Sequence, residues 1–181
     1  MPSQDIAAAL KRVETVLLRR PEAGLHEDAS ATARWQGGTR IVASHANGTQ
    51  METDMPSELG GSGDRVTPGW MFRAGVASCA ATSIALQAAA EGIELDWLEV
   101  RVGSHSDTRG MLGMADADGT RVCAAPVDVH LDVRIAANGV SAERLRHLVE
   151  HGYRCSPMPS ALRKEMPVEL HIEVESPVAA G

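Results

Sequence analysis

The stretch GWMFRAGVASCAATSIALQAAAEG, residues 69–92, decides the fold of this chain. It follows Thr67 and Pro68, which are typical of a helix start because a threonine side chain caps free amides and proline suits the first turn. Gly92 is a typical helix stop. Arg73 is the one charged residue before the last turn, so the helix is apolar nearly all round and is expected to be buried. Its many small residues allow close backbone approach, and we expect it to pack tightly at the centre of the protein.

Shorter elements surround this helix in an order typical of the α+β class. The spacing of apolar residues predicts a helix over residues 5–20 and a second helix that Ser141 caps. Alternation of apolar and polar residues between Val127 and Ile135 predicts a half-buried strand of an antiparallel sheet. The other predicted elements are short strands within 29–42, at 50–53, at 98–102 and at 168–174, and a helical turn over 159–163. This order indicates α+β rather than a doubly wound α/β fold.

The composition of the 181 residues excludes several classes of protein. A net charge of −7 argues against nucleic acid as a partner, because phosphate binding needs a basic surface. No apolar run approaches the roughly 18 residues that span a bilayer. The N-terminus does not resemble a signal peptide, so we expect a cytoplasmic protein with no membrane partner. Aromatic residues make up only 3%, and a core this poor in large side chains suggests further burial in a dimer interface.

Three cysteines, Cys79, Cys123 and Cys155, carry the candidate chemistry. They form no CxxC pair and no secreted-protein framework, so we expect reduced thiols. Cys123 is interpreted as a packing residue. Cys79 lies midway along the long helix and Cys155 at the end of the second, and one interpretation is that both are small buried hydrophobes. The other is a redox pair, in which one thiolate attacks a peroxide, becomes a sulfenic acid and condenses with the second thiol.

Four pieces of the sequence carry a resemblance to a known family. They are PSELGGSGDRVTPGWMFRAGVASCAAT (56–82), DTRGMLGM (107–114), the alternating strand followed by the Ser141 helix, and GYRCSPMPSALRKEMPVELHIEV (152–174). Together they resemble the OsmC/Ohr superfamily of thiol-dependent peroxidases, with the two cysteine motifs in the expected order. The similarity runs from about Ala33 to Val174, most of the chain.

The resemblance implies a fold and a reaction. The fold is α+β, with curved antiparallel sheets around two central helices in an intertwined homodimer. Residues 1–28 would be an N-terminal helical extension, 29–176 the OsmC-like domain and 177–181 a tail. By the resemblance, Cys79 is the peroxidatic thiol and Cys155 the resolving thiol. The substrate would be a hydroperoxide, organic ones included, an external dithiol would be the reductant, and no cofactor would be needed.

One departure from the family concerns the cation that activates the thiol. The family has a glutamate just after the proline of the helix start, which orients an activating arginine, and this chain has Gly69 there. Arg40 is the best match for that arginine, with Arg34 and Arg65 as weaker candidates. Arg73 is a substitute cation, but it lies six residues from the thiol and so on another face of the helix. It would have to act on the thiol of the partner subunit.

Two alternative interpretations remain open at this stage. In the first, the same dimer cleft binds a small apolar molecule and the cysteines are slow sensors, which the Gly69 departure favours. In the second, His147, His151 and Cys155, spaced four residues apart on one helix, hold a zinc ion, although no fourth ligand is evident.

Overall fold

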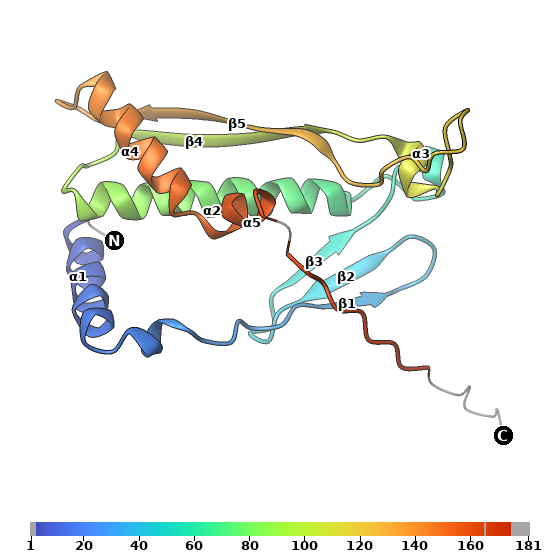
Figure 1. Cartoon of the computed structure of the whole chain (residues 1–181), viewed down its shortest axis with the longest axis horizontal. Helices are drawn as coiled ribbons and strands as arrows, with labels where there is room; N and C mark the ends of the chain where they lie inside the picture. The colour runs from blue at the N-terminus through green and yellow to red at the C-terminus, as the bar shows by residue number, and fades with distance from the viewer. Residues whose placement is uncertain (1–2, 165, 175–181) are drawn as a thin grey trace.

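The structure is a computed structural model that describes residues 3–164 and 166–174. Its centre is helix α2 (Pro68–Ala90), and a two-stranded antiparallel sheet of β4 (Trp97–His105) and β5 (Val127–Ala136) lies along it (Figure 1). Helices α4 (Ala142–Arg154) and α5 (Pro157–Leu162) also pack against α2. The predicted α+β class is confirmed.

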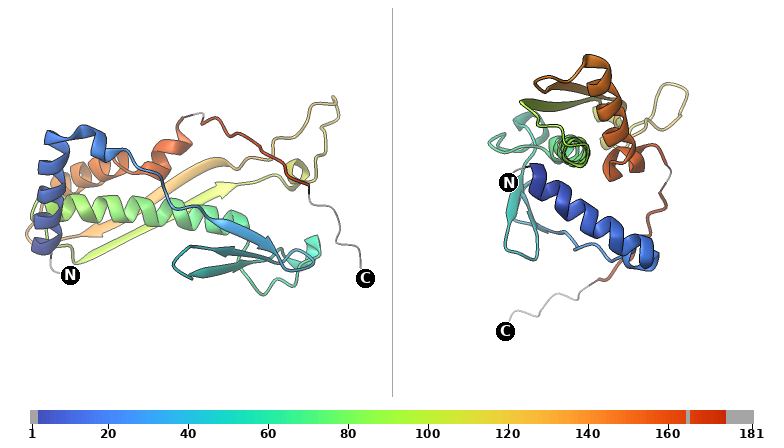
Figure 2. Two further views of the ribbon diagram at one scale, coloured as in Figure 1. Left: turned by 90° about the horizontal axis from the view of Figure 1, so that it is seen from below. Right: turned by 90° about the vertical axis from the view of Figure 1, so that its left-hand side faces the viewer.

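The N-terminal third of the chain forms one long helix and a second sheet. Helix α1 (Ser3–Arg19) contacts α2 and is followed by the short helix η1 (Pro21–Gly24). Strands β1 (Thr32–Trp35), β2 (Ile41–Ser44) and β3 (Gln50–Thr53) form an antiparallel sheet in that order. This sheet lies apart from the β4–β5 sheet in all views (Figures 1 and 2). The remaining elements are η2 (Ser57–Leu59), which precedes α2, and α3 (Thr108–Met111), which follows β4.

Local signals in the sequence set the ends of the main helices. The Thr67 side chain accepts a hydrogen bond from the Trp70 amide at 3.2 Å, and the Ser141 side chain accepts one from the Arg144 amide at the same distance. Each side chain satisfies an amide that has no partner within its helix. Both predicted helix starts are therefore confirmed.

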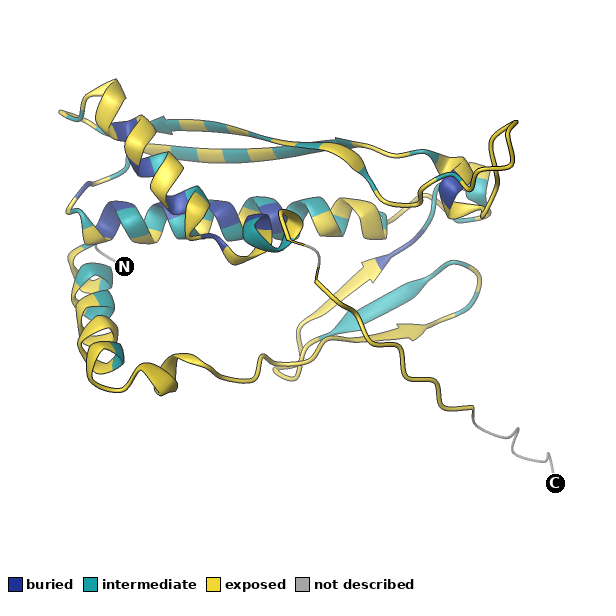
Figure 3. Cartoon of the chain, viewed as in Figure 1, coloured by how far each residue is buried: buried dark blue, intermediate teal, exposed yellow. Residues whose placement is uncertain are grey.

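Burial follows one face of α2 instead of its whole circumference. Val76, Ala80, Ile84 and Ala88, spaced four residues apart, are almost completely buried (Figure 3). They share a face because four residues make about one helical turn. Other faces carry exposed large side chains, Trp70, Phe72 and Leu86. The expectation of a helix buried all round is wrong for a single chain, because those faces meet too few elements of the same chain.

The C-terminal segment also differs from its prediction. Residues 166–174 are not part of a strand, and Val168, Leu170, Ile172 and Val174 are between 74% and 90% exposed. The alternating pattern is that of a strand, but no sheet edge of the described chain pairs with it (Figure 1). The predicted tail at 177–181 lies outside the described residues.

Candidate functional site

The Cys79 thiol lies on α2 at the point where α4 gives way to α5. Two groups from that junction face its sulfur. The Ser156 hydroxyl donates a hydrogen bond to Cys79 Sγ at 3.2 Å, and the Met158 backbone amide donates another at 3.4 Å. Cys79 is half-buried and Ser156 is fully buried. The thiol therefore lies in a small polar environment, although the helix that carries it is mostly apolar.

Backbone geometry brings the junction onto α2. Cys155 ends α4, and Ser156 precedes Pro157, the first residue of α5. Proline suits that position because its missing N–H is one that a helix start leaves unpaired. The backbone of Ser156 is held on both sides: its amide donates to the Tyr153 carbonyl at 3.2 Å, and its carbonyl accepts from the Ser160 amide at 3.1 Å. These bonds position the main chain of Ser156, and its hydroxyl bonds to the Cys79 sulfur.

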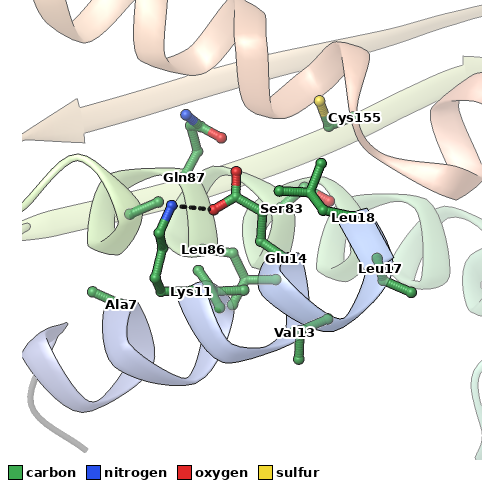
Figure 4. A pocket seen from close by; sticks show the side chains of 12 residues that line it. Ala7, Lys11, Val13, Glu14, Leu17, Leu18, Ser83, Leu86, Gln87 and Cys155 are labelled. Atoms are coloured by element: carbon green, nitrogen blue, oxygen red, sulfur yellow. Dashed lines mark hydrogen bonds and ion pairs between the residues drawn. The ribbon is translucent and has the colours of Figure 1, made fainter. Parts of the chain in front are cut away.

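Cys155 lies at the same junction but lines a different space. Its exposed thiol borders a groove of about 890 Å³ between α1 and the last turns of α2. Figure 4 shows it beside Leu18 of α1 and Ser83 of α2, and Cys79 is not among the residues that line the groove. Both cysteines are free thiols. The structure thus brings Cys79 together with Ser156, the neighbour of Cys155 in the sequence.

Sequence reasoning missed Ser156 as a neighbour of the thiol. It directly precedes Pro157, and the resemblance drew attention to the cysteine one residue earlier. The contact between residues 79 and 156 is tertiary, and the sequence pattern alone gives no sign of which side chain at the end of α4 faces α2. The one local signal was position 156 itself, since a serine before a proline is typical of a helix cap.

The candidate arginines have other partners in this chain. Arg40 lies near three carboxylates: its guanidinium is 2.6 Å from Asp64, 3.2 Å from Asp54 and 3.5 Å from Glu52. Arg73 donates to the Ser104 hydroxyl at 3.4 Å. Among the described residues, no arginine is within hydrogen-bond distance of Cys79 Sγ.

The two weaker candidates for the activating cation, Arg65 and Arg34, are also placed by the structure. Arg65 pairs with Glu52 at 2.6 Å and with Asp64 at 3.1 Å, and its hydrogen bond to Glu52 is the main reason that the pKa of Arg65 is raised. Arg34 is an exposed residue of β1. At position 69, a Cβ atom would have the Arg73 guanidinium at 3.7 Å and the Thr67 hydroxyl at 3.9 Å as its nearest neighbours. Gly69 therefore leaves room there but supplies no carboxylate.

Asp54 organises the loop that leads from β3 into α2. Its buried carboxylate accepts hydrogen bonds from the Ser62 hydroxyl and amide, from Thr39 and from the Met55 amide. These donors stabilise the ionised form, so the pKa of Asp54 lies well below its usual range, with the Ser62 hydroxyl as the largest cause. The network fixes Arg40 and the loop before α2 relative to the β1–β3 sheet.

The structure bears on the other candidate chemistries as well. In residues 3–164 and 166–174 no group of three or more His, Cys, Asp or Glu side chains could hold a metal ion, so the zinc interpretation of His147, His151 and Cys155 is not supported. Cys123 is exposed, which contradicts its interpretation as a packing residue. No helix of this part of the chain has the length and apolar character needed to cross a membrane.

Comparison with known proteins agrees with this architecture. A family model described as OsmC-like protein matches residues 61–171, more than half of the chain. A search of curated protein sequences gave no match. The match includes α2 with Cys79 and the junction with Ser156.

Several solved structures have a similar fold at low sequence identity. An OsmC-like protein from Mycoplasma pneumoniae is 17% identical, with a TM-score of 0.62 over 77% of this chain and 89% of that chain. An OsmC-like protein of unknown function from Vibrio cholerae is 12% identical, with a TM-score of 0.61 over 77% and 96%. An organic hydroperoxide resistance protein from Elizabethkingia anophelis is 21% identical, with a TM-score of 0.55 over 77% and 90%. At these identities the likeness concerns the fold.

Proposed function

Because this chain belongs to the OsmC-like protein family, we propose that it is a thiol-dependent peroxidase in which Cys79 attacks hydroperoxides. One observation carries the proposal: the Cys79 thiol is half-buried, and two hydrogen-bond donors point at its sulfur. The names of two structural relatives, both organic hydroperoxide resistance proteins, support the choice of substrate. Oxidative-stress defence would be the corresponding role.

The proposed first step transfers one oxygen atom to sulfur. The Cys79 thiolate attacks the terminal oxygen of the hydroperoxide, an S–O bond forms and the O–O bond breaks. The leaving alkoxide takes a proton and departs as an alcohol, and the sulfur is left as a sulfenic acid. The thiol loses two electrons and the peroxide gains them, so the step uses no metal and no organic cofactor.

Cys155 is the proposed resolving thiol. Its sulfur attacks the sulfenic sulfur of Cys79, water leaves and a disulfide forms. An external dithiol then reduces the disulfide and is itself oxidised, which places the protein in a reducing compartment such as the cytoplasm. Because Cys155 borders the α1–α2 groove and Ser156 faces Cys79, this step requires the turn between α4 and α5 to rearrange.

We propose that the working unit is a homodimer. A compact monomer of 19.2 kDa would expose about 8,400 Å², whereas this chain exposes 13818 Å². Much of that surface is apolar, including Trp35, Trp97 and the alternating side chains of the segment 166–174. In the dimer, Arg40 or Arg73 of one subunit would supply the cation for Cys79 of the other, since neither contacts the thiol of its own chain.

A second candidate function is small-molecule binding or redox sensing with little peroxidase activity. The observation that favours it is the absence, within the described chain, of an arginine at Cys79, together with Gly69 where the family has glutamate. The groove between α1 and α2 offers a site, with apolar walls and a Lys11–Glu14 ion pair of 2.7 Å (Figure 4). The two functions differ in whether the thiol reacts with peroxide.

One experiment separates the two functions. The fully reduced protein is mixed with cumene hydroperoxide, and the free thiols and the remaining peroxide are measured over minutes. The peroxidase proposal expects rapid loss of both the Cys79 and the Cys155 thiols, with one hydroperoxide molecule consumed for every two thiols lost. Cys79→Ser abolishes the reaction, and Cys155→Ser leaves a sulfenic acid that dimedone labels.

Cys123→Ser is the matched control, because Cys123 is an exposed thiol that the proposed reaction does not use. It should consume peroxide like the unmodified protein. If the unmodified protein retains all its thiols and consumes no peroxide, the peroxidase proposal is wrong and the binding function is the better one.

A further inference from the structure

The Ser156 hydroxyl forms the shorter of the two hydrogen bonds that the described residues donate to the Cys79 sulfur. We propose that Ser156 is a positioning residue, which orients the Cys79 sulfur and stabilises its ionised, reactive form through this hydrogen bond. The inference rests on the proposed function, because Ser156 matters for catalysis only if the Cys79 thiol attacks the hydroperoxide. It assigns a role to a residue that the sequence motifs did not single out.

Burial makes the Ser156 contact specific. Ser156 is 0% exposed, so its hydroxyl has no bulk water with which to bond. Within residues 3–164 and 166–174, its recorded side-chain hydrogen bond is the one to Cys79 Sγ. A buried hydroxyl that lacks a partner is costly, and therefore the sulfur and the hydroxyl satisfy each other. The backbone bonds on both sides of Ser156 hold its main chain against α2.

Charge explains why this contact would affect reactivity. The thiolate is the nucleophilic form of cysteine. A hydrogen bond to an ionised acceptor is roughly twice as strong as one between neutral groups. The Ser156 hydroxyl and the Met158 amide both donate to the sulfur, so they would stabilise negative charge that it carries. Among residues 3–164 and 166–174, no arginine is within hydrogen-bond distance of the Cys79 sulfur, and these two neutral donors are its hydrogen-bond partners.

The test compares Ser156→Ala with Ser160→Ala in a background that carries Cys123→Ser and Cys155→Ser. Cys79 is then the only thiol, and its alkylation by iodoacetamide is followed by mass spectrometry. Ser160 lies one turn further along α5, and its hydroxyl bonds to Arg154 and Arg163 and not to Cys79. Circular dichroism and thermal melting check that both variants are folded.

The expected result depends on pH. At about pH 7, Ser156→Ala should slow alkylation about tenfold, while Ser160→Ala leaves the rate unchanged. At about pH 10.5 the two variants should react at similar rates, because cysteines in general are thiolates at that pH with or without a hydrogen-bond donor. Equal rates at the lower pH would overturn the proposal. So would an equal slowing at both pH values, which would indicate altered access to the sulfur.

Single-turnover reaction with cumene hydroperoxide is measured on the same variants. The proposal expects the same tenfold difference there, if the chain is a peroxidase. Failure of the proposed function has a distinct signature: no variant consumes hydroperoxide, yet the pH-dependent difference in alkylation persists. The role of Ser156 would then stand without the peroxidase.

Discussion

Gly152 of α4 lies directly against Ile84 of α2, so closely that a Cβ atom on the glycine would come within 2.7 Å of the Ile84 Cα. This approach of two backbones sets the geometry of the candidate site. Ser156 follows Gly152 by four residues, about one turn, and Cys79 precedes Ile84 by five. The two helices therefore run past each other so that the glycine contact and the Ser156–Cys79 contact lie one turn apart.

Gly152→Ala should destabilise the protein because the added methyl group collides with backbone atoms that cannot move independently. We expect a loss of about 2 kcal/mol in the free energy of unfolding, measured by urea denaturation. Helix propensity alone predicts the opposite, a gain of up to about 1 kcal/mol for alanine over glycine. His151→Ala, at an exposed neighbouring position of α4, is the control and should change stability by less than about 0.5 kcal/mol. A variant as stable as the parent would contradict the close contact.

Ser156→Cys should create a thiol that pairs with Cys79. The hydroxyl oxygen that the new sulfur replaces is 3.2 Å from Cys79 Sγ, so a small shift brings the two sulfurs to bonding distance. In a background with Cys123→Ser and Cys155→Ser, a mild oxidant such as diamide should give one intramolecular disulfide, identified by peptide mapping.

Ser160→Cys in the same background is the control for Ser156→Cys. It places a thiol one turn away on α5, where the hydroxyl that it replaces bonds to Arg154 and Arg163. It should keep both thiols free under the same oxidation. If both variants cross-link at the same rate, the junction between α4 and α5 is not fixed against α2 in the way described.

The sequence predicted most of the fold because the relevant signals are local. Thr67 and Ser141 begin their helices through hydrogen bonds within four residues, and the alternation from Val127 to Ile135 is a property of β5 alone. The position of Cys79 on the central helix followed from the same local reasoning. Burial of α2 on all sides did not follow, because it depends on what lies opposite each face.

The partner of Cys79 could not be predicted for a related reason. A contact between positions 79 and 156 depends on the crossing of α2 and α4, which Gly152 sets through its lack of a side chain. Periodicity indicates which residues share a helix face, but not which residue of another helix lies against it. The strand pattern at 168–174 shows the same limit, since a strand forms only where another strand is present to pair with it.

Acid should destabilise the protein in part through Asp54. Hydrogen bonds from Ser62, Thr39 and Met55 hold the folded-state pKa of Asp54 below its usual value of 3.8. The folded protein therefore binds fewer protons than the unfolded chain, so this contribution to stability is complete above about pH 5 and is lost as the pH falls below about 4. Asp54→Asn should have a urea midpoint that falls less between about pH 6 and pH 3 than that of the parent.

Ser62→Ala offers a second variant for the same pH dependence. It removes the donor with the largest effect on Asp54, so it should reduce the fall in the urea midpoint in the same direction but by a smaller amount. Some acid sensitivity should persist in both variants, because the pKa values of Asp64 and Glu52 are also lowered by their partners. An Asp54→Asn protein as acid-sensitive as the parent would contradict the assignment.

Ile172→Asp should weaken the proposed dimer. Ile172 is 74% exposed in the single chain and belongs to an alternating apolar row that meets no sheet edge of the described residues. If a second copy covers this row, a buried unpaired carboxylate would be strongly unfavourable, and sedimentation velocity should show a shift from dimer toward monomer at micromolar concentration.

His171→Asp, on the opposite side of the same extended segment, introduces the same charge and should leave the dimer intact. Equal sedimentation of both variants with the parent protein would exclude this segment from the interface, and a monomeric parent would refute the dimer itself.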